Sequence, residues 1–150
     1  MLTGRISDAD TAERVVRDGL ADFAIMGRAL IADSHLVEKY AAGRKDEICP
    51  CVACGQSCVG NADKMIPITC ALNPLSGREA SMPAVPKAET PRRVVVVGAG
   101  PAGLMAAATA AERGHEVILL ERSDRHGGQI NLAAVPPHKD NLRFISDYLY

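Results

Sequence analysis

All five cysteines of this 150-residue chain lie within one segment, residues 49–70. Four of them follow the spacing Cys51-x2-Cys54-x3-Cys58-x11-Cys70. Three thiolates from one tight loop and a fourth from a later turn can surround a compact inorganic centre, because the short spacings bring the sulfur atoms close together. Iron–sulfur clusters are ligated in this way. The spacing therefore favours an iron–sulfur cluster in this segment.

Two other uses of these thiols stay open. A tetrahedral zinc ion also accepts four thiolates, but structural zinc sites more often contain two Cys-x2-4-Cys pairs, and the second pair is missing here. A disulfide framework is less favoured, because the cysteine count is odd and the chain carries no secretory signal. Cys49 stands outside the spacing, and in the sequence Cys-Pro-Cys it could compete with Cys51 as a ligand.

The composition argues against several classes of partner. The formal net charge is −1 and Lys and Arg form no runs, so the chain has no electrostatic footprint for nucleic acid or an anionic membrane. Neither a membrane-spanning apolar stretch nor a signal peptide is recognisable. We therefore expect a protein of the reducing cytoplasm that binds no nucleic acid and no membrane.

The first 48 residues are expected to alternate between helix and strand. Ser7 starts a capping-box-like sequence, which predicts a helix over residues 8–19. The apolar run 21–26 predicts a strand followed by a glycine turn, and residues 34–42 predict a second helix. This order is typical of the end of a β/α barrel.

Two glycine–arginine pairs, Gly4-Arg5 and Gly27-Arg28, are expected at the carboxyl ends of strands. In β/α barrels the loops after the last two strands commonly bind a phosphate through backbone N–H groups, and glycine permits the close approach. On the residues alone, ordinary strand-to-helix turns with solvated arginines are the simpler interpretation.

A second pattern begins after a proline-containing linker, residues 76–92. Residues 93–97 predict a buried strand, an alanine-rich helix follows to Arg113, and residues 116–121 predict a second strand. The glycines between the first strand and the helix complete the order that is typical of a dinucleotide-binding βαβ unit.

Each glycine of this motif has a separate reason to be there. Gly98 allows the tight turn, Gly100 lets the backbone approach a pyrophosphate, and Gly103 lets the helix pack against the strand. Glu121 ends the second strand, where an acidic side chain accepts a hydrogen bond from a ribose hydroxyl and disfavours a 2′-phosphate. The site should therefore hold FAD, ADP or NAD rather than NADP.

Three motifs in this order resemble one family. They are MGRALIADSHLVEKYAAGR, the cysteine spacing followed by Asn73-Pro74, and VVVVGAGPAGLMAAATAAERGHEVILLE followed by GGQINLA. Together they resemble the 2,4-dienoyl-CoA reductase and trimethylamine dehydrogenase family, the long Old Yellow Enzyme-type NADH:flavin oxidoreductases with an iron–sulfur cluster. The resemblance covers essentially the whole chain.

The resemblance implies an α/β protein with a defined division of the chain. Residues 1–48 would end an FMN-binding TIM β/α barrel, residues 49–75 would carry a 4Fe-4S cluster, and residues 76–92 would be a linker. Residues 93–150 would start a Rossmann-like domain that binds FAD or ADP and receives an inserted nicotinamide domain. The chain would then be an internal fragment.

The same resemblance assigns site residues. FMN phosphate would be bound by Gly4, Arg5, Gly27 and Arg28, and the cluster by Cys51, Cys54, Cys58 and Cys70. The FAD or ADP site would comprise Gly98, Gly100, Pro101, Ala102, Gly103, Glu121 and Arg122, with Gly128 and Gln129 approaching the flavin side. No catalytic residue of the family falls within the chain.

The implied activity is the transfer of electrons from NAD(P)H through FAD and the cluster to FMN, and on to a small substrate with an activated C=C bond. The rest of the barrel and the nicotinamide domain would be the chain's own partners, so we expect the 150 residues alone to be inactive. A stand-alone electron-transfer or dinucleotide-binding module is the alternative, and a zinc-stabilised structural module is another.

Overall fold

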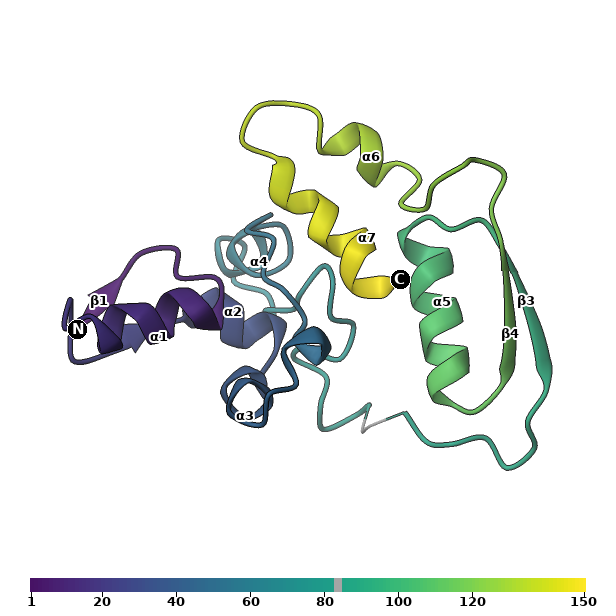
Figure 1. Ribbon diagram of the computed structural model, residues 1–150, viewed down its shortest axis with the longest axis horizontal. Helices are drawn as coiled ribbons and strands as arrows, with labels where there is room; N and C mark the ends of the chain where they lie inside the picture. Colours follow the sequence, from purple (N-terminus) through teal and green to yellow (C-terminus); the bar gives the residue numbers. More distant parts are fainter. Residues whose placement is uncertain (83–84) are drawn as a thin grey trace. The chain divides into compact units, whose positions relative to one another are not determined.

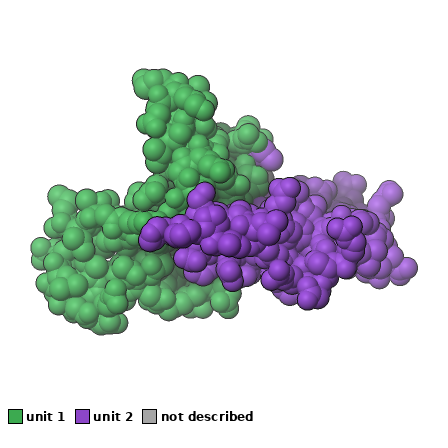
Figure 2. Space-filling view, turned by 90° about the horizontal axis from the view of Figure 1, so that it is seen from above, with its two compact units in different colours: residues 1–81 green, residues 82–150 purple. Residues whose placement is uncertain are grey.

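The computed structural model describes residues 1–82 and 85–150, which form two compact α/β units, Met1–Ser81 and Met82–Tyr150 (Figure 2). The boundary between the units falls inside the predicted linker, residues 76–92. No helix in the described ranges combines the length and the hydrophobicity needed to cross a membrane.

The first unit contains two short parallel strands that pair with each other and are connected by a helix (Figure 1). Leu2 lies opposite Ala24 and Thr3 opposite Ile25. The elements in order are β1 (Leu2–Thr3), α1 (Ala9–Arg17), β2 (Ala24–Ile25), α2 (Gly27–Ala32), α3 (Leu36–Ala41), the 3-10 turn η1 (Lys45–Glu47) and α4 (Val59–Ala62).

The N-terminus of α1 differs from the prediction by one residue. Asp8, not Ser7, is the N-cap, and its carboxylate accepts a hydrogen bond of 2.7 Å from the Thr11 N–H. Both Asp and Ser are good N-cap residues, and Asp8 satisfies the orphan donor of the first turn from its own position. The helix ends at Arg17, and Val15 is the residue of α1 that is buried.

The prediction of a plain glycine turn at Gly27-Arg28 was wrong. The strand is shorter than predicted, and the chain enters α2 at Gly27 directly after β2. Ala29 and Ala32 are each only 1% exposed, because α2 is packed inside the first unit. α3 follows at Leu36 instead of residue 34, and Gly43 after it has the positive φ of +73° that is usual just beyond a helix.

The second unit contains a parallel βαβ arrangement whose two strands pair along their whole length. Its elements are β3 (Arg93–Val97), α5 (Pro101–Glu112), β4 (Glu116–Leu120), α6 (Ile130–Ala133), the 3-10 turn η2 (Asp140–Leu142) and α7 (Arg143–Leu149). Helix α5 packs against both strands. Gly100 is its N-cap and Pro101 its first residue, a position where the missing N–H of proline has no cost.

Burial of β3 is one-sided, which corrects the prediction of a buried strand. Val94 and Val96 are half-buried, whereas Val95 is 54% exposed and Val97 is 82% exposed. Alternate side chains of a strand point to opposite faces of the sheet. One face of the two-stranded sheet is therefore covered, and the other is open in the described structure.

Candidate functional site

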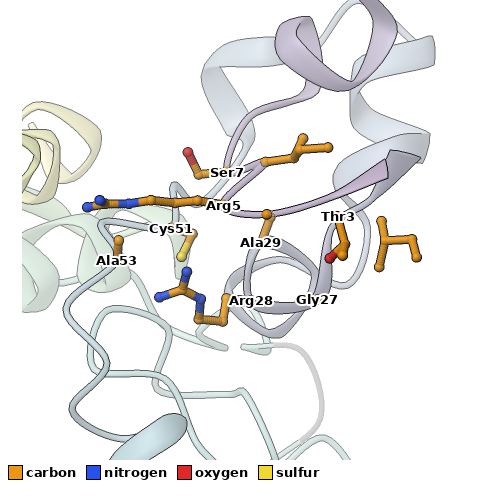
Figure 3. Close-up of a pocket in the computed structure, with 11 residues that line it drawn as sticks. Thr3, Arg5, Ser7, Gly27, Arg28, Ala29, Cys51 and Ala53 are labelled. Carbon is orange, nitrogen blue, oxygen red and sulfur yellow. The ribbon is translucent and has the colours of Figure 1, made fainter. Parts of the chain in front are cut away.

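The residues predicted to bind the FMN phosphate line a single pocket of about 240 Å³ in the first unit (Figure 3). Gly4 and Arg5 reach it from the segment after β1, and Gly27 and Arg28 from the start of α2. The other lining residues are Thr3, Ile6, Ser7, Ile25, Ala29, Cys51 and Ala53. Parallel pairing of β1 and β2 brings the two glycine–arginine pairs together, although 23 positions separate them in the sequence.

The backbone at the first pair has an uncommon conformation. Gly4 has a φ of +130°, and Arg5 has a φ of +57°, in the left-handed region that a residue with a side chain adopts at a cost. Neither Arg5 nor Arg28 is in an ion pair within the described residues. The pocket therefore carries two positive charges without a carboxylate partner, which favours an anion.

A second cavity in the same unit is lined by all four cysteines of the predicted ligand set, Cys51, Cys54, Cys58 and Cys70. The Thr69 N–H donates a hydrogen bond of 3.0 Å to the Ser57 carbonyl. This bond holds the backbone before the fourth cysteine beside the backbone before the third. The segment that contains Thr69 thus brings the fourth cysteine to the cavity of the other three.

The loop on either side of Cys54 turns sharply. Ala53 has a φ of +53° and Gly55 a φ of +68°, so the chain curls around the cavity. Cys51, Cys58 and Cys70 are half-buried and Cys54 is exposed. None of the five cysteines, all within the described structure, forms a disulfide.

The four cysteines line this one cavity. No group of three or more His, Cys, Asp or Glu side chains among the described residues is arranged to hold a single metal ion. A single zinc ion needs sulfur atoms about 2.3 Å from a common centre. A polynuclear cluster spreads its ligands over a larger volume, and four thiols around one cavity have the chemistry to ligate it.

The pocket that contains Arg5 and Arg28 and the cysteine cavity adjoin each other. Arg28, Cys51 and Ala53 line both of them. In Figure 3, the side chains of Arg5, Arg28 and Cys51 lie toward the same end of the pocket. Two groups bound at these places would therefore be neighbours.

A buried carboxylate, which the sequence analysis missed, lies beside the cysteine segment. Asp33 follows α2 and is 4% exposed. Burial opposes the charged form, but hydrogen bonds from Lys39, Cys49 and His35 outweigh it, so the pKa of Asp33 lies below its usual value. In the sequence, Asp33 stands just before a predicted helix, where an aspartate is ordinarily read as part of a cap.

In the second unit, the glycine motif and the later Gly127-Gly128 pair come together. The Gly127 N–H donates to the Ala99 carbonyl at 2.7 Å, and Gly128 lies against Gly100. The predicted residues Pro101 and Ala102 form the first turn of α5, next to this loop. Arg122 and Gln129 are exposed, and no described contact ties either side chain to the loop.

Glu121 closes the loop from the end of β4. One carboxylate oxygen accepts from the Ala99 N–H at 2.7 Å, and the other accepts from the Ser123 N–H at 2.8 Å. The Ser123 N–H, the Ala99 N–H and the Ser123 hydroxyl lower the pKa of Glu121 from its ordinary value of 4.5 to about 2. A carboxylate has room for about four hydrogen bonds, so an oxygen lone pair remains for a ribose hydroxyl.

This depressed pKa predicts an acid-labile loop. A group whose pKa is lowered by folding stabilises the fold above its unfolded pKa, and that contribution is lost as the pH falls from about 4.5 to about 2. Glu121→Gln should therefore flatten the loss of thermal stability of the second unit over this range. Glu116→Gln, at the other end of the same strand, is the matched control. Identical pH profiles for wild type and Glu121→Gln, followed by circular dichroism, would contradict the prediction.

Comparison with known proteins gives one family-model match and several close relatives. Residues 93–146 match the family described as FAD dependent oxidoreductase. The chain is 40% identical over 147 residues to the NADH oxidase of Thermoanaerobacter brockii, covering 97% of this chain and 23% of that protein. It is 43% identical over 145 residues to the multifunctional alkene reductase/demethylase of Caballeronia cordobensis, covering 96% and 21%.

Among solved structures, 2-naphthoyl-CoA reductase in complex with 2-naphthoyl-CoA matches with a TM-score of 0.90 at 36% identity, over 97% of this chain and 22% of that chain. The chain thus spans less than a quarter of the length of these relatives. The matches place it among the flavin-dependent oxidoreductases. Within that class, the similarity extends over almost the whole of this chain and confirms the resemblance to the 2,4-dienoyl-CoA reductase and trimethylamine dehydrogenase family that was seen in the sequence.

Proposed function

We propose that this chain forms the junction between cofactors in an NAD(P)H-dependent oxidoreductase that reduces an activated C=C bond. The observation that carries the proposal is the pair of adjoining cavities in the first unit. One holds two arginines without carboxylate partners, the other is lined by four cysteines, and Arg28, Cys51 and Ala53 belong to both.

The first cavity fits the phosphate of FMN. A Cβ built at Gly4 or Gly27 meets nothing within 4 Å, so the space beside both glycines is open to a ligand. Arg5 and Arg28 supply the charge that a phosphate needs. On this proposal, residues 1–48 are the end of an FMN-binding β/α barrel.

The second cavity fits a 4Fe-4S cluster ligated by Cys51, Cys54, Cys58 and Cys70. Thiolate is the ligand that such clusters take, and the four side chains line one cavity. Ligation through reduced thiols also suits a cytoplasmic protein. When bound, the cluster would supply single-electron transfer, and FMN would supply hydride transfer to the substrate.

The second unit fits the ADP portion of FAD, or ADP itself. Gly98 and Gly100 leave the backbone open, and Gly128 lies over the same loop. Glu121 is held at the ribose position of the motif by its bonds to Ala99 and Ser123. On this proposal, residues 93–150 are the start of a Rossmann-like domain.

Two relatives support the proposed substrate class, an alkene reductase/demethylase and a 2-naphthoyl-CoA reductase. Both act on unsaturated small molecules, so a small substrate with an activated double bond is proposed for the protein. The rest of the barrel and a nicotinamide domain would complete the enzyme. The donor is NADH or NADPH.

Analysis of bound cofactors tests the proposal. The full-length gene product, purified without oxygen, should contain about four iron and four sulfide per chain, together with FMN and FAD, and its visible absorbance should bleach on reduction. Stoichiometric zinc without visible absorbance would contradict it and favour the zinc-stabilised structural module. Iron without any flavin would favour a stand-alone electron-transfer module.

A further inference from the structure

Asp33 fixes the start of the cysteine segment to the end of α2. One carboxylate oxygen accepts from the Cys49 N–H at 2.9 Å and from the Lys39 ammonium at 2.7 Å. The other oxygen accepts from the His35 N–H at 3.0 Å. The carboxylate is almost fully buried, and its partner Lys39 is about four-fifths buried. These bonds leave the Asp33 side chain little freedom.

Lys39 extends the contact to a second point of the same backbone. Besides the ion pair, its ammonium donates a hydrogen bond of 2.8 Å to the Glu47 carbonyl. The pair Asp33–Lys39 therefore holds the chain at Glu47 and at Cys49, just before the predicted ligand Cys51. Two successive peptide groups shortly before the first ligand are thus fixed, one through its carbonyl and the next through its N–H.

The far end of the segment is tied to the same place. The Asn73 side-chain amide donates to the Ala32 carbonyl at 2.8 Å, and the Ser76 hydroxyl donates to the Ile31 carbonyl at 2.7 Å. Carbonyls in the last turn of a helix have no partner within the helix, so these bonds satisfy them. Both ends of the cysteine segment therefore meet at the C-terminal end of α2, whose other end begins at the phosphate pocket.

We propose that Asp33, acting through Lys39 and the Cys49 N–H, is a positioning residue that holds the Cys49–Cys51 backbone in the conformation needed to ligate the iron–sulfur cluster. The inference rests on the proposed function. A buried ion pair adds little net stability compared with apolar residues of the same size. Its directional bonds, however, select one backbone arrangement, and here that arrangement leads directly into Cys51. Groups that orient metal ligands in this way change metal affinity by about 10- to 100-fold when removed.

The test uses three variants of the full-length gene product. Asp33→Ala removes both carboxylate oxygens, which accept from the Cys49 N–H, the His35 N–H and the Lys39 ammonium. Asp10→Ala is the matched control, because Asp10 also pairs with a lysine, at 2.6 Å to Lys45, but is 69% exposed and far from the cysteines in the chain. Asp33→Asn keeps the size of the side chain, and its amide oxygen can still accept from Lys39 and from the Cys49 N–H, which share one carboxylate oxygen in the wild type.

Cluster loss to an iron chelator, the electron paramagnetic resonance spectrum and the midpoint potential of the cluster are measured, with bound FMN as a reporter of the folding of the first unit. Asp33→Ala should lose its cluster about 10- to 100-fold faster than wild type and show an altered spectrum, at normal FMN content. Asp10→Ala should match wild type, and Asp33→Asn should recover most of the retention.

Three results would contradict the inference, and a fourth would contradict the proposed function. Unchanged retention and spectrum in Asp33→Ala would overturn the inference. A folded Asp33→Asn protein that loses its cluster as fast as Asp33→Ala would show that the acceptor for the Cys49 N–H is not the cause. If both Asp33 variants fail to bind FMN and to fold, Asp33 supports the whole first unit and the specific role falls. An iron-free wild type would contradict the proposed function itself.

Discussion

Replacement of any one of Cys51, Cys54, Cys58 and Cys70 by alanine is expected to remove the iron–sulfur cluster from the full-length gene product, whereas Cys49→Ala should keep it. The four cysteines line one cavity, and Cys49 is absent from its lining. Cys49 is 4% exposed, and its N–H donates a hydrogen bond to the Asp33 carboxylate, so its backbone makes a structural contact. A cluster that loses one of four thiolates loses the ligand that completes its coordination.

Iron and sulfide analysis with visible absorbance measures the effect. Each of the four variants should fall from about four iron per chain to below about one, and Cys49→Ala should stay near four. All five variants remove a single thiol, so Cys49→Ala controls for the loss of a buried sulfur in the same loop. If Cys49→Ala empties the site while Cys51→Ala keeps its iron, Cys49 is the ligand, and the set predicted from the spacing is wrong.

The second large effect is expected at the glycine motif, where alanine substitutions at two glycines should be harmful for different reasons. A Cβ built on Gly103 would lie 1.9 Å from the Gly98 carbonyl oxygen and 3.1 Å from its carbon. These are backbone atoms of the tight turn, and they cannot move without displacing β3 from α5. Gly103→Ala should therefore destabilise the second unit by about 1–3 kcal/mol or more, as overpacking of a close contact does.

Gly100→Ala is the matched comparison two positions from the turn. Gly100 has a φ of −76°, and a Cβ built there meets nothing within 4 Å, so the empty protein should fold as stably as wild type. The methyl group would instead occupy the space through which the backbone approaches a pyrophosphate, and affinity for FAD or ADP should fall at least about tenfold.

Urea unfolding and titration with ADP separate the two effects. Gly103→Ala should shift the unfolding midpoint, and Gly100→Ala should shift the binding curve alone. A Gly103→Ala protein as stable as wild type would mean that the turn relaxes away from the helix. Undiminished nucleotide affinity in Gly100→Ala would show that the loop is not the binding site.

Local sequence was sufficient to predict the structure wherever the conformation of a short segment depends on its own residues. The valine run and the glycines that follow it place β3 over Arg93–Val97, as predicted, because the strand, the turn and the start of α5 depend on neighbouring residues. The cysteine spacing likewise identified four thiols that line one cavity. Propensity and turn chemistry act over a few residues, and they were informative here.

Tertiary contacts decided the rest. Gly27-Arg28 begins a helix because α2 buries Ala29 and Ala32 inside the first unit, and a glycine-led sequence gives no local signal for that. Asp33 is joined to Cys49 across 16 positions, and the side chains of Asn73 and Ser76 reach α2 across more than 40. Such contacts carry no periodic pattern in the sequence. The sequence by itself therefore determined which residues are candidates to bind cofactors, and only the folded chain decided which contacts hold those residues in place.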